Sequence, residues 1–255
     1  MKRTTEERYK IGFVGLSAGA GATTLAFAAT EYLAAIASKS GKTVTMLELN
    51  PANGASAGWS YDKVGIDRRF AGRSYTPIYR IASEGKPLKN VVNIDSGINW
   101  ALRVPGISSS PEHGVVSSTP VLLRLLNNVH GNIIVCDISA YNFFHIPSGR
   151  DTLTMLLADL DLIICVFDPL PSRLLVSVPA TEACRAATSA GSKTRWVFNK
   201  MNPGVDIREV IRFTGIKDFL PFPAIPIETV YRTEYACRSL ATVPEAEAAL
   251  TTLLR

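Results

Sequence analysis

The chain has 255 residues, 47% of them hydrophobic and 19% charged, so it can bury a large core and is not intrinsically disordered. Its formal net charge of +5 permits an anionic partner but does not require one. No apolar run reaches the ~18 residues of a membrane span, and the charged first ten residues contain no apolar signal segment. We therefore expect a cytoplasmic protein without a transmembrane segment.

Predicted strands and helices alternate along the whole chain. Strands are predicted at residues 11–16, 43–49, 91–94, 98–104, 132–136, 162–167, 195–198 and 219–222. Helices are predicted at residues 24–38, 120–128, 153–159, 174–190, 206–213, 228–240 and 245–254. Continuous Val/Ile/Leu strands that alternate with helices indicate a parallel sheet covered on both faces. We predict one α/β domain over residues 1–255, with three α/β/α layers around a mostly parallel, twisted sheet.

A glycine-rich loop follows the first predicted strand, and it reads Gly-Leu-Ser-Ala-Gly-Ala-Gly-Ala-Thr-Thr over residues 15–24. A strand, such a loop and a helix that opens on Thr-Thr are the context of a Walker A phosphate-binding loop, which ends in Gly-Lys-Thr. Here the ending is Gly21-Ala22-Thr23, so the backbone cradle is kept and the lysine is missing. Backbone N–H groups and the helix dipole can still attract phosphate. The alternative is a tight turn that binds no ligand.

Polar residues or glycine lie at or near the ends of four predicted strands: Gly15, Glu48, Asp137 and Asn199. The carboxyl ends of parallel strands share one edge of a sheet, where α/β proteins bind their ligands. We therefore expect Thr23 and Asn199 at the same edge. Two structural interpretations stay open, since Asp137 can cap a turn and Asn199 can satisfy loop backbone groups.

The order of these motifs resembles the ParA/MinD family of deviant-Walker ATPases over nearly the whole chain. The matching segments are residues 17–23, Glu48-Leu49-Asn50-Pro51, Val104-Pro105-Gly106, Asp137 and Asn199-Lys200. The resemblance implies a P-loop NTPase-like fold and ATP or ADP with Mg²⁺ as cofactor. It places the nucleotide on Gly19, Gly21, Thr23, Thr24 and Asn199, with Thr23 and Asp137 as the metal-binding pair.

The chain departs from the family at the positions that carry charge. The Walker lysine falls at Ala22, the family's second signature lysine at Ser17, and the carboxylate beside the attacking water at Asn50. Loss of one phosphate-binding lysine weakens binding by roughly 2–5 kcal/mol. We predict no catalytic residue and a degenerate Walker A loop. The expected function is that of a pseudo-ATPase switch in binding, localisation or assembly, and weak or absent nucleotide binding is also consistent with the sequence.

Other functions stay open beside this one. A slow Mg²⁺-dependent ATPase would take its lysine from elsewhere, either Lys200 or Lys42. A DNA partition factor has thin support in the net charge and one arginine cluster. A narrower resemblance to the TadZ/CpaE group points to pilus assembly. We expect a protein partner and consider a homodimer, and nucleic acid stays an alternative partner.

The remaining polar residues give structural expectations. Residues 54–90 form the least regular stretch, and four arginines in residues 68–80 indicate a contact surface rather than core. Reversing the charge of Arg68, Arg69 and Arg73 should then leave the melting temperature nearly unchanged. The four cysteines fit no paired spacing and are expected as reduced thiols. The three histidines, His113, His130 and His145, match no metal-ligand spacing.

Overall fold

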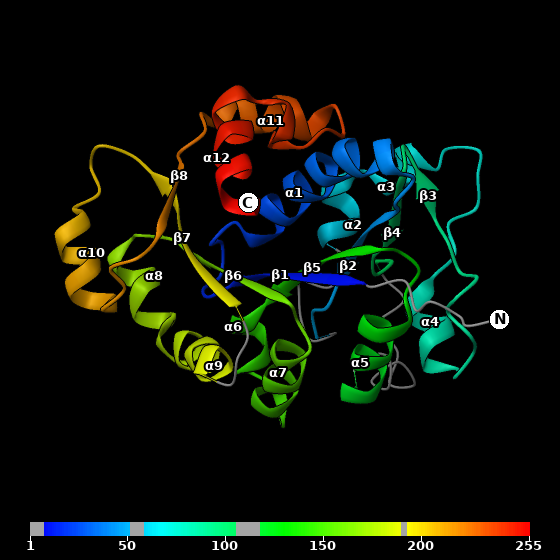
Figure 1. Cartoon of the computed structure of the whole chain (residues 1–255), viewed down its shortest axis with the longest axis horizontal. Coiled ribbons are helices and arrows are strands. Elements are labelled where there is room, and N and C mark those ends of the chain that lie inside the picture. Colours follow the sequence, from blue (N-terminus) through cyan, green and yellow to red (C-terminus); the bar gives the residue numbers. More distant parts are fainter. Residues whose placement is uncertain (1–7, 52–58, 106–117, 190–192) are drawn as a thin grey trace.

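The computed structural model describes residues 8–51, 59–105, 118–189 and 193–255, which form one twisted sheet with helices on both faces (Figure 1). Its eight strands are β1 (Tyr9–Gly15), β2 (Val44–Glu48), β3 (Ile94–Asp95), β4 (Ile98–Ala101), β5 (Ile133–Ser139), β6 (Leu162–Phe167), β7 (Lys193–Met201) and β8 (Leu220–Pro223). They lie in the order β3-β4-β2-β5-β1-β6-β7-β8, and only the β3–β4 pair is antiparallel. This confirms the predicted α/β fold with a mostly parallel sheet.

Two groups of helices cover the sheet. One face packs against α1 (Ala22–Ala37), α2 (Trp59–Val64), α3 (Ile66–Arg69) and α12 (Pro244–Leu254), with α11 (Ile227–Tyr235) on the same side in Figure 1. The other packs against α4 (Ile78–Ser83), α5 (Thr119–Asn128), α6 (Ala140–Phe143), α7 (Gly149–Ala158), α8 (Pro171–Val176), α9 (Val178–Ser189) and α10 (Ile207–Thr214). None of the helices in the described part of the chain is long and apolar enough to cross a membrane.

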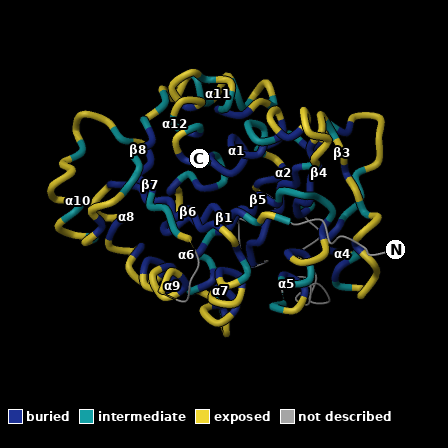
Figure 2. Tube along the Cα trace, in the orientation of Figure 1, coloured by how far each residue is buried: buried dark blue, intermediate teal, exposed yellow. Residues whose placement is uncertain are grey.

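Each central strand contributes to two cores, because successive side chains of a strand point to opposite faces. In β6, Leu162, Ile164 and Val166 lie in the core beneath α1 and α12. Ile163, Cys165 and Phe167 lie in the core beneath α7 and α9. Figure 2 shows the strands as a buried centre and the outer helix faces as exposed. Because both faces of β6 are buried, its sequence is a continuous apolar run.

Several element boundaries differ from the prediction for identifiable reasons. The predicted helix at 174–190 is two helices that meet at Ser177, since Pro179 lacks an N–H and its ring crowds the carbonyl four residues earlier. The strands predicted at 91–94 and 98–104 are shorter and form a hairpin of β3 and β4. The stretch 54–90 is more regular than expected, because its described part contains α2, α3 and α4.

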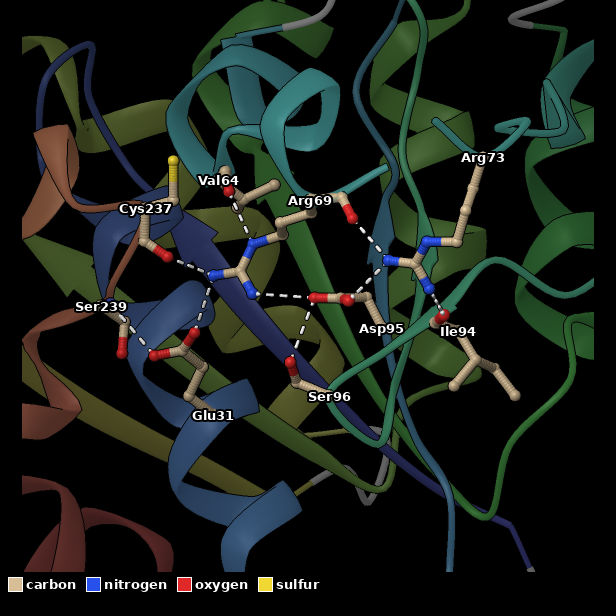
Figure 3. A network of polar contacts seen from close by, with 9 residues as sticks. All are labelled: Glu31, Val64, Arg69, Arg73, Ile94, Asp95, Ser96, Cys237 and Ser239. Carbon is tan, nitrogen blue, oxygen red and sulfur yellow. Dashed lines mark hydrogen bonds and ion pairs between the residues drawn. The ribbon is translucent and has the colours of Figure 1, made fainter. Parts of the chain in front are cut away.

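Arg69 joins four separate parts of the chain, as Figure 3 shows. Its guanidinium forms ion pairs with Glu31 of α1 at 2.9 Å and with Asp95 of β3 at 3.4 Å. It also donates to the backbone carbonyl of Cys237 and lies 4.8 Å from the Trp100 ring centroid. The side chain is only 10% exposed. Arg69 therefore fastens α3 to α1, to the β3–β4 hairpin and to the segment before the last helix.

The expectation of a contact surface at residues 68–80 is wrong for part of the segment. Phe70 and Tyr79 are buried in the two cores, and Arg69 is largely buried with its carboxylate partners. Arg68, Arg73 and Arg80 are exposed. Burial raises the pKa of Asp95, but hydrogen bonds from Arg73, Ser96 and Arg69 outweigh burial and hold that pKa below its usual range. The arginines thus divide between structure and surface.

The cysteines behave as predicted. All four are free in the structure, and Cys136, Cys165 and Cys184 are buried while Cys237 is half-buried. Burial raises the pKa of the Cys136 and Cys165 thiols above their ordinary value, so both stay protonated and chemically inert at neutral pH.

Replacement of Arg69 by alanine is expected to lower the free energy of unfolding by about 2–4 kcal/mol, because Glu31 loses its ion-pair partner in a largely buried position. Thermal and urea unfolding measure the change. Arg80→Ala is the control, since the Arg80 side chain is 69% exposed and its ion-pair partner in the described part of the chain is Glu84, just after the end of α4. Equal melting temperatures for the two variants would contradict a structural role for Arg69.

Candidate functional site

The glycine-rich loop occupies residues 16–21 between β1 and α1. Gly19 and Gly21 have φ angles of 73° and 92°, in the left-handed region that strains residues with a side chain. The Leu16 amide donates to Val166 of β6 at 3.2 Å, and the Leu25 amide donates to Gly21 at 3.0 Å. The two glycines therefore allow the chain to turn sharply out of the sheet and directly into a 16-residue helix.

Two residues at the carboxyl end of β7 donate hydrogen bonds to this loop. The Asn199 side-chain amide donates to the Ala20 carbonyl at 2.8 Å, and the Lys200 ammonium donates to the Gly19 carbonyl at 2.7 Å. The approach is close, since a Cβ added to Gly21 would lie 2.2 Å from Asn199 Nδ2. Asn199 and the loop thus share one edge of the sheet, as the parallel topology predicted.

Asp137, near the carboxyl end of β5, faces the start of α1. The Thr23 hydroxyl donates to its two oxygens at 2.9 and 3.1 Å, and the Ser60 hydroxyl of α2 donates at 2.8 Å. Asp137 is 1% exposed. Burial raises its pKa, which the hydrogen bonds from Ser60 and Thr23 and the charge of Lys63 only partly offset. The two residues expected to hold Mg²⁺ are therefore adjacent, and a hydroxyl and a carboxylate are ligands suited to that ion.

A cavity of about 610 Å³ opens over the loop and the start of α1. It is lined by loop residues 17–21 and by Thr23, Thr24, Asn50, Trp59, Ser60, Asp137 and Asn142. Among the described residues, the lysine and arginine side chains that line the cavity are those of Lys63 and Lys200. In the part of the chain that the structure describes, the Ser17 hydroxyl in the cavity wall has no hydrogen-bond partner, and no side chain caps α1. The wall thus offers unused donors to an anionic ligand.

Asn50, which follows β2, lies in the cavity wall but is already engaged. Its side-chain oxygen accepts from the Ser139 amide at 2.5 Å, and its backbone carbonyl accepts from Arg103 Nη2 at 2.8 Å. The fully buried Glu48 accepts from the Arg103 amide at 3.2 Å. The carboxamide therefore ties β2 to the end of β5, and it cannot take a proton from water.

Arg103 is a residue that the sequence analysis missed. It is 2% exposed, and its guanidinium lies 4.3 Å from the Tyr79 ring centroid. Its position at the end of an apolar strand could have indicated a buried arginine with a structural role, since a buried charge needs specific partners. Arg103 thus supports the segment behind the cavity. Gly106, part of the predicted Val104-Pro105-Gly106 motif, lies outside the described residues.

The other candidate residues divide by the edge of the sheet on which they lie. Lys42 precedes the amino end of β2, opposite the loop, and so cannot serve this cavity, whereas Lys200 lines it.

His145 also lines the cavity and contacts Tyr141, whereas His113 lies outside the described residues. Within the described ranges no three His, Cys, Asp or Glu residues are grouped as metal ligands.

Replacement of Gly21 by alanine is expected to destabilise the fold by about 2–3 kcal/mol, because the new methyl group meets Asn199 in addition to the left-handed backbone strain. Gly19→Ala is the matched control. It carries similar strain at φ 73° but has nothing within 4 Å of the new Cβ, so about 1 kcal/mol is expected. Denaturant unfolding measures both. If the double change Gly21→Ala/Asn199→Ala recovers none of the loss, the contact with Asn199 is not its cause.

The raised pKa of Asp137 makes stability depend on pH. Below about pH 4 the carboxyl is protonated in both the folded and the unfolded chain. As the pH rises toward the higher folded pKa, the unfolded chain releases the proton more readily, so the free energy of unfolding falls. Asp137→Asn removes this dependence. The melting temperature of the variant relative to the unchanged protein should increase from about pH 4 to pH 7 in Mg²⁺-free buffer, and a difference independent of pH would contradict it.

No family model matches the sequence, and neither does any curated protein. Solved structures do match the fold. A ParA family ATPase from Chlorobium tepidum superposes with a TM-score of 0.71 at 15% identity over 98% of this chain and 99% of that one. A plasmid partition protein from Borrelia burgdorferi superposes with a TM-score of 0.66 at 14% identity, over 97% of this chain and 98% of that one. The cell-division ATPase MinD of Pyrococcus furiosus superposes with a TM-score of 0.63 at 13% identity, over 95% of each chain. The chain therefore has the fold of the ParA/MinD ATPases over nearly its full length.

Proposed function

We propose that this protein is a degenerate ParA/MinD-like nucleotide switch that binds ATP or ADP at the glycine-rich loop and hydrolyses it little or not at all. The observation that carries the proposal is that the loop has the backbone geometry of a phosphate-binding loop but lacks its charged side chains. The left-handed glycines, the uncapped helix and the Thr23–Asp137 pair are present, whereas positions 17, 22 and 50 hold serine, alanine and asparagine.

Nucleotide binding is supported by the size and chemistry of the cavity. About 610 Å³ falls in the range of small-molecule sites. The buried Ser17 hydroxyl and the uncapped start of α1 offer donors where phosphate oxygens would lie. Thr23 and Asp137 would hold Mg²⁺, which neutralises phosphate charge when it is bound. Structures of similar fold include the Borrelia partition protein bound to AMPPNP and a Cyanothece McdA variant in complex with ATP.

Weak hydrolysis is supported by what the site cannot do. Asn50 has no basic carboxylate to accept a proton, and its oxygen is occupied by the Ser139 amide. The two missing lysines would each stabilise charge on the transferring phosphoryl group by roughly 2–5 kcal/mol. The second candidate, a slow Mg²⁺-dependent ATPase, is favoured by one observation, namely that Lys200 brings an ammonium into the same cavity.

A protein partner is supported by an exposed stripe on α11. Ile227, Tyr231 and Tyr235 follow one another at helical spacing and are 54%, 57% and 75% exposed. Exposed aromatic residues of this kind are enriched at protein interfaces. A MinD of similar fold from Aquifex aeolicus was solved in complex with MinC. Homodimer formation, DNA partition and a role in pilus assembly stay predictions from the sequence resemblance.

The decisive experiment titrates the purified protein with a fluorescent ATP analogue with and without Mg²⁺, and measures phosphate release in parallel. We expect saturable binding that Mg²⁺ strengthens, with release at background. Asp137→Ala should abolish the Mg²⁺ effect, whereas Asp218→Ala, an exposed aspartate away from the cavity, should preserve it. Absence of binding would refute the switch. Turnover that disappears in Asp137→Ala would replace the pseudo-ATPase with the slow enzyme.

A further inference from the structure

Lys200 places a positive charge beside a loop that has lost both of its own. We propose that Lys200 is the phosphate-contacting cation of this site, and that Asp168 competes with the phosphates for its ammonium. This inference rests on the proposed function and adds which residue selects for a di- or triphosphate chain. It goes beyond the family resemblance, which places Asn199 but not Lys200 among the nucleotide-binding residues.

The backbone of β7 directs Lys200 toward the loop. Its φ of 60° is left-handed, which is unfavourable for a residue with a side chain and requires surrounding support. Part of that support comes from Asn199, whose side-chain oxygen accepts from the Lys200 amide at 2.9 Å while its amide group donates to Ala20. The Lys200 ammonium then lies 2.7 Å from the Gly19 carbonyl. The left-handed conformation thus places the Lys200 ammonium beside Gly19, in the middle of the loop.

Asp168, which directly follows β6, holds the other side of the same ammonium. Its Oδ2 lies 2.7 Å from Lys200 Nζ, and its Oδ1 accepts from the Leu170 amide at 3.1 Å. Asp168 is 4% exposed, so the carboxylate is fixed, whereas the Lys200 side chain is 48% exposed. The partner of this pair that solvent or a ligand can reach is therefore the lysine. A phosphate chain over Gly19 would lie within reach of a small rotation of the side chain.

The second cation of the cavity is less suited to this role. Lys63 pairs with Glu234 of α11, and its side chain is 22% exposed. Burial raises the pKa of Asp137, and the charge of Lys63 partly offsets this together with the hydrogen bonds from Ser60 and Thr23. Lys200, in contrast, is hydrogen-bonded to the loop itself. A lysine acts on phosphate as a flexible point charge, so it does not need the rigid geometry that an arginine would impose.

Isothermal titration of the full chain with ATP, adenosine and tripolyphosphate tests the assignment. Lys200→Gln should weaken ATP and tripolyphosphate roughly fivefold or more and leave adenosine unchanged, because it removes one solvent-accessible charge contact. Lys200→Arg should restore most of the affinity. Asp168→Asn should tighten both phosphate ligands by a similar factor, since it removes the competing charge and keeps an oxygen for the Leu170 amide. Lys193→Gln, at the opposite end of β7, is the matched control.

The outcomes separate this inference from the proposed function. Unchanged ATP and tripolyphosphate affinities in a folded Lys200→Gln variant, verified by its melting curve, would overturn the assignment while nucleotide binding stands. So would an equal loss for adenosine and ATP, which would place Lys200 at the base. Tripolyphosphate binding that depends on Lys200, without any nucleotide binding, would support the assignment and refute the nucleotide switch. A protein that binds none of the three ligands would overturn both.

Discussion

The hydrogen bond from Asn199 to the Ala20 carbonyl is the contact on which the geometry of the candidate site depends. It joins residues that are 179 positions apart, and the parallel sheet makes it possible by bringing the ends of β1 and β7 to one edge. Two loop carbonyls accept hydrogen bonds from the Asn199 and Lys200 side chains. The loop can therefore keep its shape without a ligand, and glycine at position 21 is required by the closeness of Asn199.

The candidate site combines the Thr23–Asp137 pair with uncharged residues at positions 17, 22 and 50. Thr23 and Asp137 remain in contact, and the carboxyl carries the desolvation cost of full burial, seen in its raised pKa. Such a cost is offset when a cation binds beside the carboxylate. At position 50 the asparagine side-chain oxygen accepts a hydrogen bond from the Ser139 amide. In the proposed function this arrangement thus favours holding a nucleotide over cleaving it.

Much of the fold could be predicted because its signals are local. Apolar strand runs and the glycine-rich loop gave the parallel sheet, and strand polarity alone brought Asp137 and Asn199 to the loop. The burial of Arg69 could not be predicted, since its partners Glu31, Asp95 and Cys237 come from separate parts of the chain. The same holds for Arg103 and for the Asp168–Lys200 pair. Their roles depend on tertiary contacts, which leave no periodic pattern in the sequence.

The Arg69 cluster has a consequence for how the protein is made. The contact between Arg69 and the Cys237 carbonyl spans 168 positions, and Ser239 in turn donates its amide to Glu31. A nascent chain on the ribosome exposes α1, α3 and the β3–β4 hairpin long before this closing segment is synthesised. The guanidinium then has carboxylates but not its full set of acceptors. The contacts on that face therefore cannot all form before the segment with Cys237 and Ser239 has been synthesised.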